Sequence, residues 1–234
     1  EVFGFIGPNG AGKSTAIKVL TGVLKASKGS AMLFGKDVGL PEARRGLGYV
    51  PENPSLYDYL TPLEILMMGL AIHGVKRANP RAHCMQWLER FALSQVADKR
   101  VRSFSKGMTQ RVALAHAMAI QPRLLILDEP LSGLDPVGRK DVVDILGEYR
   151  AAGGTVFLTS HVLHDVERLA DRFGLIHRGR LVSVQAPSEL LHNEQTVTVR
   201  SAGSAPVAGF VVETKGRWRA YVRRDQLWDV LENL

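Results

Sequence analysis

The fold follows from one stretch near the start of the chain, Gly7-Pro8-Asn9-Gly10-Ala11-Gly12-Lys13-Ser14-Thr15. It matches the pattern G-x-x-x-x-G-K-[ST], and it joins an apolar segment typical of a strand to one with helical spacing. Glycine lets backbone N–H groups surround phosphate oxygens, and the helix directs its positive N-terminal end toward them. Lys13 supplies a cation for the terminal phosphates, and the Ser14 hydroxyl suits Mg²⁺. The stretch therefore predicts an α/β fold that binds a nucleotide.

Size and composition indicate a globular protein with one core and a small appendage. The chain has 234 residues, of which 45% are hydrophobic and 23% charged, which argues against disorder. Its net charge of +7 suits nucleic acid or anionic lipid headgroups, and it equally suits a solvated surface with no dedicated partner. Cys84 is the single cysteine, so an intrachain disulfide is excluded. The longest apolar run, residues 65–72, is too short to cross a bilayer.

Apolar β-rich segments alternate with helical patterns along the chain, which predicts a parallel sheet covered by helices. We expect strands at 2–6, 47–50, 124–127, 155–159, 173–176 and 180–184, a short hairpin around 30–34, and helices at 14–24, 112–120, from 135 onward and 161–170. An all-helical insert is expected at about 58–105, opened by the capping box Thr61-Pro62-Leu63-Glu64. We expect one domain over 1–195 and a β-rich extension over 196–234 that ends in a helix from Gln226.

A pair of carboxylates follows the apolar strand at 124–127. Asp128 and Glu129 stand at the carboxyl end of that strand, where parallel sheets bind their ligands. Asp128 is placed to hold Mg²⁺ through its water shell, and Glu129 is placed to orient or deprotonate an attacking water. After a phosphate-binding loop, this pair predicts nucleotide hydrolysis more strongly than a solvated acidic turn.

Three further motifs follow in a fixed order. They are Ser105-Lys106-Gly107-Met108 with Gln110-Arg111, then Ser132-Gly133-Leu134-Asp135, then Thr159-Ser160-His161. Together with the phosphate loop and the acidic pair they make the chain resemble the ATP-binding-cassette (ABC) family over roughly residues 1–190. The segment Tyr49-Val50-Pro51-Glu52 and the Phe-Ser-Lys-Gly-Met form of the signature resemble the cassettes of bacterial ABC-2-type exporters.

The resemblance implies a P-loop, ABC-type ATPase domain with a RecA-like, mostly parallel sheet and a helical insert. It implies that ATP is bound by Asn9, Gly10, Ala11, Gly12, Lys13, Ser14 and Thr15, and Mg²⁺ by Ser14, Asp128 and Glu52. Catalysis would rest on Glu129, His161 and Glu52. The signature Ser105, Lys106, Gly107 and Met108 would act on the ATP of a partner subunit, and Ser132 and Asp135 would belong to the D-loop. Ser105 would open a helix whose N-terminus offers positive potential to the terminal phosphate of that ATP.

The sequence departs from the family pattern at three points. Glu52 stands where the family usually has glutamine, and it adds a negative charge near the phosphates. Lys106 and Met108 replace the commoner glycine and glutamine, whereas Ser105 and Gly107 remain to offer a hydroxyl and a backbone N–H. The aromatic residue that stacks on adenine in this family would lie upstream of the first residue. We therefore expect missing upstream sequence and weakened ATP binding by this chain.

The family resemblance implies two kinds of partner and a place in the cell. A second copy of the cassette would complete each ATP site, and membrane permease subunits would dock on the helical insert. Leu56, Tyr57, Tyr59 and Leu60 suit such a docking groove, and they suit local core packing equally well. The chain would then power export from the inner face of the cell membrane. A nucleic-acid-acting ABC protein and a regulator that binds ATP without hydrolysis are the alternatives, and we expect no nucleic-acid partner.

Overall fold

The computed structural model of the chain describes residues 1–189, 196–202, 209–214 and 216–223. It divides the chain into two compact units, residues 1–184 and 185–234. The division falls earlier than the expected boundary after residue 195, which lies outside the described residues, as does the helix expected from Gln226. In the described part of the chain no helix is long and apolar enough to span a bilayer.

The larger unit is built on a six-stranded sheet with the order β4-β5-β6-β1-β7-β8. The strands are β1 (Val2–Ile6), β4 (Leu47–Val50), β5 (Leu124–Asp128), β6 (Thr155–Ser160), β7 (Arg172–His177) and β8 (Arg180–Gln185). Adjacent strands from β4 through β7 pair in parallel. The expected mostly parallel sheet is therefore confirmed, and β6 lies between the strand that precedes the phosphate loop and the strand that carries the acidic pair.

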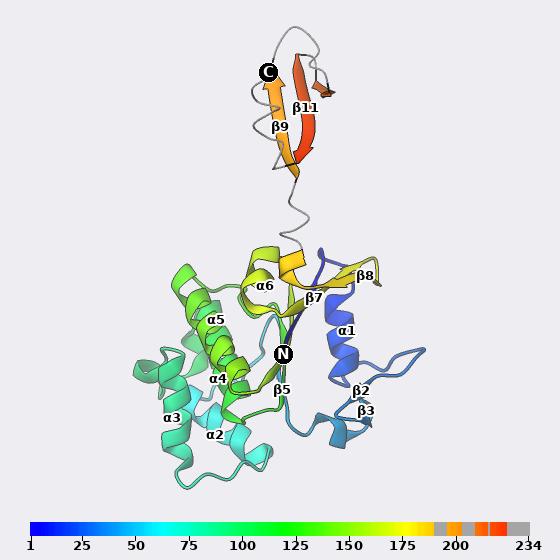
Figure 1. The fold of residues 1–234 in the computed structure, drawn as a ribbon. Helices are drawn as coiled ribbons and strands as arrows, with labels where there is room; N and C mark the ends of the chain where they lie inside the picture. The colour runs from blue at the N-terminus through cyan, green and yellow to red at the C-terminus, as the bar shows by residue number, and fades with distance from the viewer. Residues whose placement is uncertain (190–195, 203–208, 215, 224–234) are drawn as a thin grey trace. The chain divides into compact units, whose positions relative to one another are not determined.

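Helices cover both faces of this sheet (Figure 1). On one face lie α1 (Lys13–Leu20) and a hairpin of β2 (Met32–Leu33) and β3 (Lys36–Asp37), where Ile17, Leu47 and Ile126 form a buried cluster. On the other face lie α4 (Lys106–Ala119), α5 (Pro136–Ala151) and α6 (Leu163–Leu169). Because the central strands are buried on both sides, the side chains at their carboxyl ends are held by a rigid core.

The helical insert contains α2 (Pro62–Ile72), α3 (Pro80–Arg90) and the 3₁₀ turns η2 (Ser94–Val96) and η3 (Val101–Ser103). The predicted capping box is present: the Thr61 side chain accepts a bond from the Glu64 backbone, and the Glu64 side chain accepts from Thr61. Leu66, Leu88, Phe91 and Leu93 are the largest fully buried side chains of the insert. Both α2 and α3 pack against α4, the helix that carries the signature.

Two helix boundaries differ from those expected, and a third helix is longer than its apolar spacing indicates. The helix α1 ends at Leu20, not at 24, because the Thr21 hydroxyl bonds the Ile17 carbonyl and Gly22 turns the backbone to φ 71°. The helix α4 begins at Lys106, directly after its cap Ser105, as expected of the signature, so the apolar spacing at 112–120 marks only its later part. The helix α6 begins at Leu163, not at 161, because the Ser160 hydroxyl accepts the Val162 N–H and delays the first helical turn.

The smaller unit contains a three-stranded antiparallel sheet. Its strands β9 (Thr196–Ala202), β10 (Val211–Thr214) and β11 (Arg217–Arg223) have the order β10-β11-β9. Val199, Ala220 and Val222 form a small core with Phe210 on one face of the sheet. The expected β-rich extension is therefore present in the described residues.

Candidate functional site

The phosphate-binding loop leads from β1 into α1, as its sequence predicts. Gly12 is the residue before the helix, and its φ of 108° is a conformation that residues with a Cβ rarely adopt. Lys13 is only 6% exposed, and its Nζ donates to the Gly7 carbonyl at 2.7 Å. The first N–H groups of a helix have no partner within the helix, so the start of α1 presents donors and positive potential to an anion.

A cavity of about 400 Å³ opens over this loop. It is lined by Asn9, Gly10, Ala11, Gly12, Lys13, Ser14, Thr15, Glu52, Glu129 and His161. The structure thus brings together residues from the phosphate loop, from the segment after β4, from the end of β5 and from the end of β6. Their roles in binding and catalysis remain predictions, but their shared cavity is a property of the fold.

Thr159, at the end of β6, fixes the acidic pair at the end of β5. Its hydroxyl donates to Oδ1 of Asp128 at 2.6 Å and accepts the backbone N–H of Glu129 at 3.0 Å. All three residues are buried, at 0%, 5% and 7% exposure for Thr159, Asp128 and Glu129. A buried hydroxyl between two such groups satisfies both, so Thr159 determines where the two carboxylates point. Sequence reasoning gave Thr159 no role, although a polar residue ending a buried strand was a usable signal.

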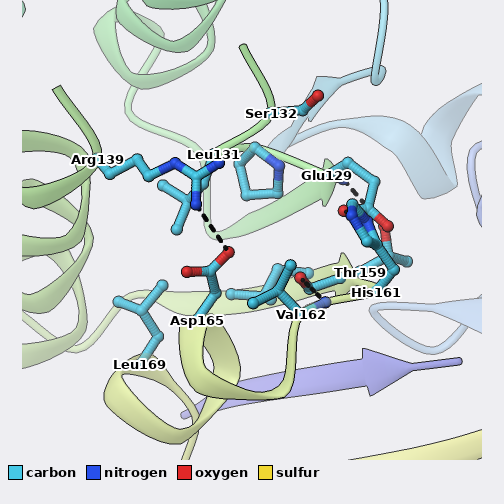
Figure 2. A pocket seen from close by; sticks show the side chains of 12 residues that line it. Glu129, Leu131, Ser132, Arg139, Thr159, His161, Val162, Asp165 and Leu169 are labelled. Carbon is cyan, nitrogen blue, oxygen red and sulfur yellow. Dashed lines mark hydrogen bonds and ion pairs between the residues drawn. The ribbon is translucent and has the colours of Figure 1, made fainter. Parts of the chain in front are cut away.

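The Glu129 carboxylate lies between a cation and an imidazole. Its Oε1 is 3.5 Å from Nζ of Lys13, and its Oε2 is 2.8 Å from Nδ1 of His161, which approaches it from the end of β6 (Figure 2). Glu129 has a left-handed φ of 49°, a costly conformation for a residue with a side chain. Such backbone strain is concentrated at functional sites, where the surrounding structure maintains it.

A second, much smaller cavity lies beside Glu129, with room for about one water molecule at roughly 20 Å³. Figure 2 shows Leu131 and Ser132 on its wall together with the ion pair between Arg139 and Asp165. The Ser132 N–H donates to the Glu129 carbonyl at 3.0 Å. The expected D-loop therefore begins by turning back onto the backbone of Glu129 and supporting its position.

The signature residues lie elsewhere. Ser105 caps α4, and its hydroxyl accepts the Met108 N–H at 3.3 Å. Residues 105–108 are all described by the structure, and none of them lines the cavity that contains Lys13. The N-terminal end of α4 is thus not part of the cavity that contains Lys13, and the action of the signature on a partner stays a prediction.

Gln110 and Arg111, which follow the signature, connect α4 to the segment after the acidic pair. The sequence did not predict this connection. Gln110 is fully buried, and its Nε2 donates to the Pro130 carbonyl at 3.2 Å. Arg111 lies 3.3 Å from Asp135, which caps α5, and donates to the Phe91 carbonyl of the insert. The adjacent Gln-Arg pair connects the signature helix, the D-loop and the helical insert within one chain.

The described residues fit a nucleoside triphosphate with Mg²⁺. The cavity offers the Lys13 cation, the N-terminus of α1 and the Ser14 hydroxyl, which suit phosphate and metal, and the buried Asp128 precedes Glu129 of the cavity lining. Burial raises the pKa of the Tyr49 hydroxyl on β4, and the negative charge of Asp128 raises it further. The charge of Asp128 on β5 therefore acts on Tyr49 of the neighbouring strand β4. Carboxylate and hydroxyl oxygens are the kind of ligand that Mg²⁺ prefers.

Comparison with known proteins identifies the family. Residues 1–132 match the sequence profile of the family described as ABC transporter. The chain belongs to the ABC transporter family. It is 38% identical over 234 residues to an uncharacterised ABC transporter ATP-binding protein of Nostoc sp., covering 96% of this chain and 70% of that protein. It is 37% identical over 185 residues to the bacitracin transport ATP-binding protein of Bacillus licheniformis, covering 78% of this chain and 60% of that protein.

Solved structures of the ABC family share the fold. One described as the ATP-binding subunit of an ABC transporter has a TM-score of 0.77 and 32% identity, covering 83% of this chain and 82% of the other. The expected ABC ATPase fold is thereby confirmed. Because the chain spans only 60–70% of the length of the two ABC relatives described above, the activity of the whole protein is a matter for proposal.

Proposed function

We propose that the chain is the ATP-binding and ATP-hydrolysing subunit of an ABC transporter that exports its substrate. The observation that supports this most directly is that Glu129 contacts both Lys13 and His161 within the phosphate-loop cavity. A cation for phosphate, a carboxylate and a histidine that orients it are the groups that hydrolysis of a terminal phosphate needs.

The residues of the cavity would have different roles in hydrolysis. Lys13 and the N-terminus of α1 would hold the phosphates, and Ser14, Asp128 and Glu52 would hold Mg²⁺, which supplies charge neutralisation. Lys13 would turn from Glu129 toward the phosphates, leaving His161 as the partner that orients the carboxylate. Glu129 would then accept the proton of the attacking water. His161 is half-exposed, so its other ring nitrogen can reach the terminal phosphate from the cavity.

A second copy of the chain would supply the remaining part of each site. The signature residues 105–108 stand outside the cavity of their own chain, and Ser105 opens a helix whose positive end suits a terminal phosphate. Two cassettes arranged head to tail would place that end over the partner's ATP. The D-loop, from Ser132 to Asp135, would lie at the same contact because it is tied to α4 through Arg111.

Coupling to transport would run through the helical insert. Tyr57 and Tyr59 are 54% and 61% exposed, their ring centroids lie 5.8 Å apart, and they stand between Glu52 and α2. These rings offer an exposed aromatic surface for a permease subunit, with Glu52 linking that surface to the cavity. The bacitracin transport relative supports a transport role, and the chain would work in the cytoplasm at the inner face of the membrane.

The E129Q variant tests hydrolysis by this site. Phosphate release should fall at least a hundredfold, because the variant loses the proton acceptor. Size-exclusion chromatography with ATP should show a trapped dimer for E129Q. E42Q, at an exposed glutamate outside the cavity, is the control and should turn over like the wild type. Equal turnover by E129Q and wild type would contradict the proposal and favour a binding-only regulator.

Mixing two inactive variants tests the shared site. K13A removes the phosphate lysine, and S105R blocks the signature, so each should be inactive alone. In a mixture, half of the dimers are mixed and one of their two sites is intact, so about a quarter of wild-type activity should return. If the mixture stays inactive while both variants fold, the site is not built from two chains.

A further inference from the structure

The sheet of the smaller unit has two faces of opposite character. Side chains alternate along β11, so Ala220 and Val222 point to one face. There they form a core with Val199 of β9, and all three are 7% exposed. This core explains why the sheet forms, and it leaves the alternate positions of the same strands for the other face.

The opposite face carries arginine and tyrosine. Arg217, Arg219 and Tyr221 occupy the alternate positions of β11, and Arg200 of β9 lies directly across from Arg219 in the register. The guanidinium carbon of Arg219 is 5.7 Å from the centre of the Tyr221 ring, which is 66% exposed. Neighbouring side chains on such a face are about 7 Å apart along the strand. We call these four residues the arginine face; β9 and β11 lie side by side in Figure 1.

We propose that the arginine face binds the anionic headgroups of a phospholipid membrane directly. Guanidinium groups form bidentate hydrogen bonds with phosphate and carboxylate oxygens, and both occur in anionic headgroups. Tyrosine settles at the boundary between headgroups and acyl chains, where its ring is apolar and its hydroxyl is wet. An anionic headgroup lying between β9 and β11 would interact with Arg200 and Arg219 at once. This contact is additional to any made by the helical insert with permease subunits.

Two observations favour a membrane over a nucleic acid. Sheets that bind single-stranded nucleic acid stack two or three bases on aromatic side chains, and Tyr221 is the one aromatic residue on the described part of the arginine face. The chain also belongs to a transporter family, so a bilayer is close to its place of action. The inference rests on that membership and not on ATP hydrolysis, so a loss of lipid binding and a loss of ATPase activity are separate results.

Vesicle binding by the full chain tests the arginine face. The wild type should float with vesicles that contain about 30% phosphatidylserine and bind pure phosphatidylcholine far more weakly, and added salt should release it. The variant R200Q/R217Q/R219Q should lose about a hundredfold in partitioning, since each cation near the surface contributes on the order of fivefold. The control K28Q/R81Q/K140Q removes the same charge from exposed residues of the larger unit and should bind like the wild type.

Two milder variants distinguish a loss of lipid binding from a loss of the fold. R200Q alone changes one exposed residue of β9 and should lose on the order of fivefold. R200K/R217K/R219K keeps the charge and should retain most binding. The proposal is overturned if R200Q binds like the wild type, if the control loses as much as the triple glutamine variant, or if phosphatidylserine makes no difference. Tighter binding of a single-stranded RNA through the same residues would assign the face to nucleic acid instead.

Discussion

At the scale of single residues, the Thr159 hydroxyl has a predicted effect on stability that the sequence did not indicate. T159V removes a hydroxyl that serves Asp128 and the Glu129 backbone, both buried. We expect a loss of about 2 kcal/mol or more in the free energy of unfolding, because two buried groups lose their partner. T159S keeps the hydroxyl and should cost only about 1 kcal/mol for the lost methyl. Urea denaturation and phosphate release on the two variants check this; equal effects would refute the hydrogen-bonding role.

His116 of α4 predicts a dependence of stability on pH. Burial lowers the pKa of His116, and the charge of His73 lowers it further. The folded protein therefore binds this proton less readily than the unfolded chain, so the stabilisation is present above about pH 6.5 and declines as the pH falls. H116Q should flatten the decline below about pH 6.5 by up to about 1.4 kcal/mol per pH unit. Denaturation curves at several pH values measure it, and an unchanged slope would contradict the prediction.

At the scale of elements, two helix caps allow the structural role of Ser105 to be distinguished from its proposed role in ATP hydrolysis. S105A should cost about 1 kcal/mol in stability, because the Met108 N–H loses its acceptor. Asn79 caps α3 in the same way, accepting the Ala82 N–H at 3.0 Å, so N79A is a matched control with a similar cost. Only S105A should also slow ATP hydrolysis, by about tenfold or more, through loss of a charged hydrogen bond. If both variants hydrolyse equally well, Ser105 is only a cap.

The elements also show what the sequence can and cannot determine. The strand β4 at Leu47–Val50 and the capping box at Thr61 have the predicted positions because apolar alternation and capping are local signals. The apolar spacing predicts only residues 112–120 of α4, because the residues from Lys106 to Arg111 lack it, whereas Ser105 as a helix-opening residue predicts the observed start. The ion pair between Arg111 and Asp135 was not predicted, because it joins two elements that come together only in the folded chain. The local motifs were enough to predict the residues that line the cavity. The contacts that fix these residues join distant parts of the chain, so only the folded structure shows them.

At the scale of the whole molecule, the two compact units predict two unfolding events. Scanning calorimetry of the full chain should show a heat absorption broader than one two-state transition, because a small unit with its own core can unfold separately. A chain ending at residue 189 should lose one component and retain binding of a fluorescent ATP analogue, since every residue lining the phosphate-loop cavity precedes that point. A single sharp transition for the full chain, or loss of nucleotide binding on truncation, would contradict this division.

The order of strands in the larger sheet has a consequence for biosynthesis. Val2 of β1 pairs with Val156 of β6 and Phe3 pairs with Arg172 of β7, so β1 finds both neighbours only after most of the unit has been made. At about 5–20 residues per second, the ribosome needs roughly 8–30 s between making Val2 and Val156. Throughout that interval the apolar strand before the phosphate loop has no sheet to join. The nascent chain should therefore depend on chaperones, and it should acquire its nucleotide only after β6 has been made.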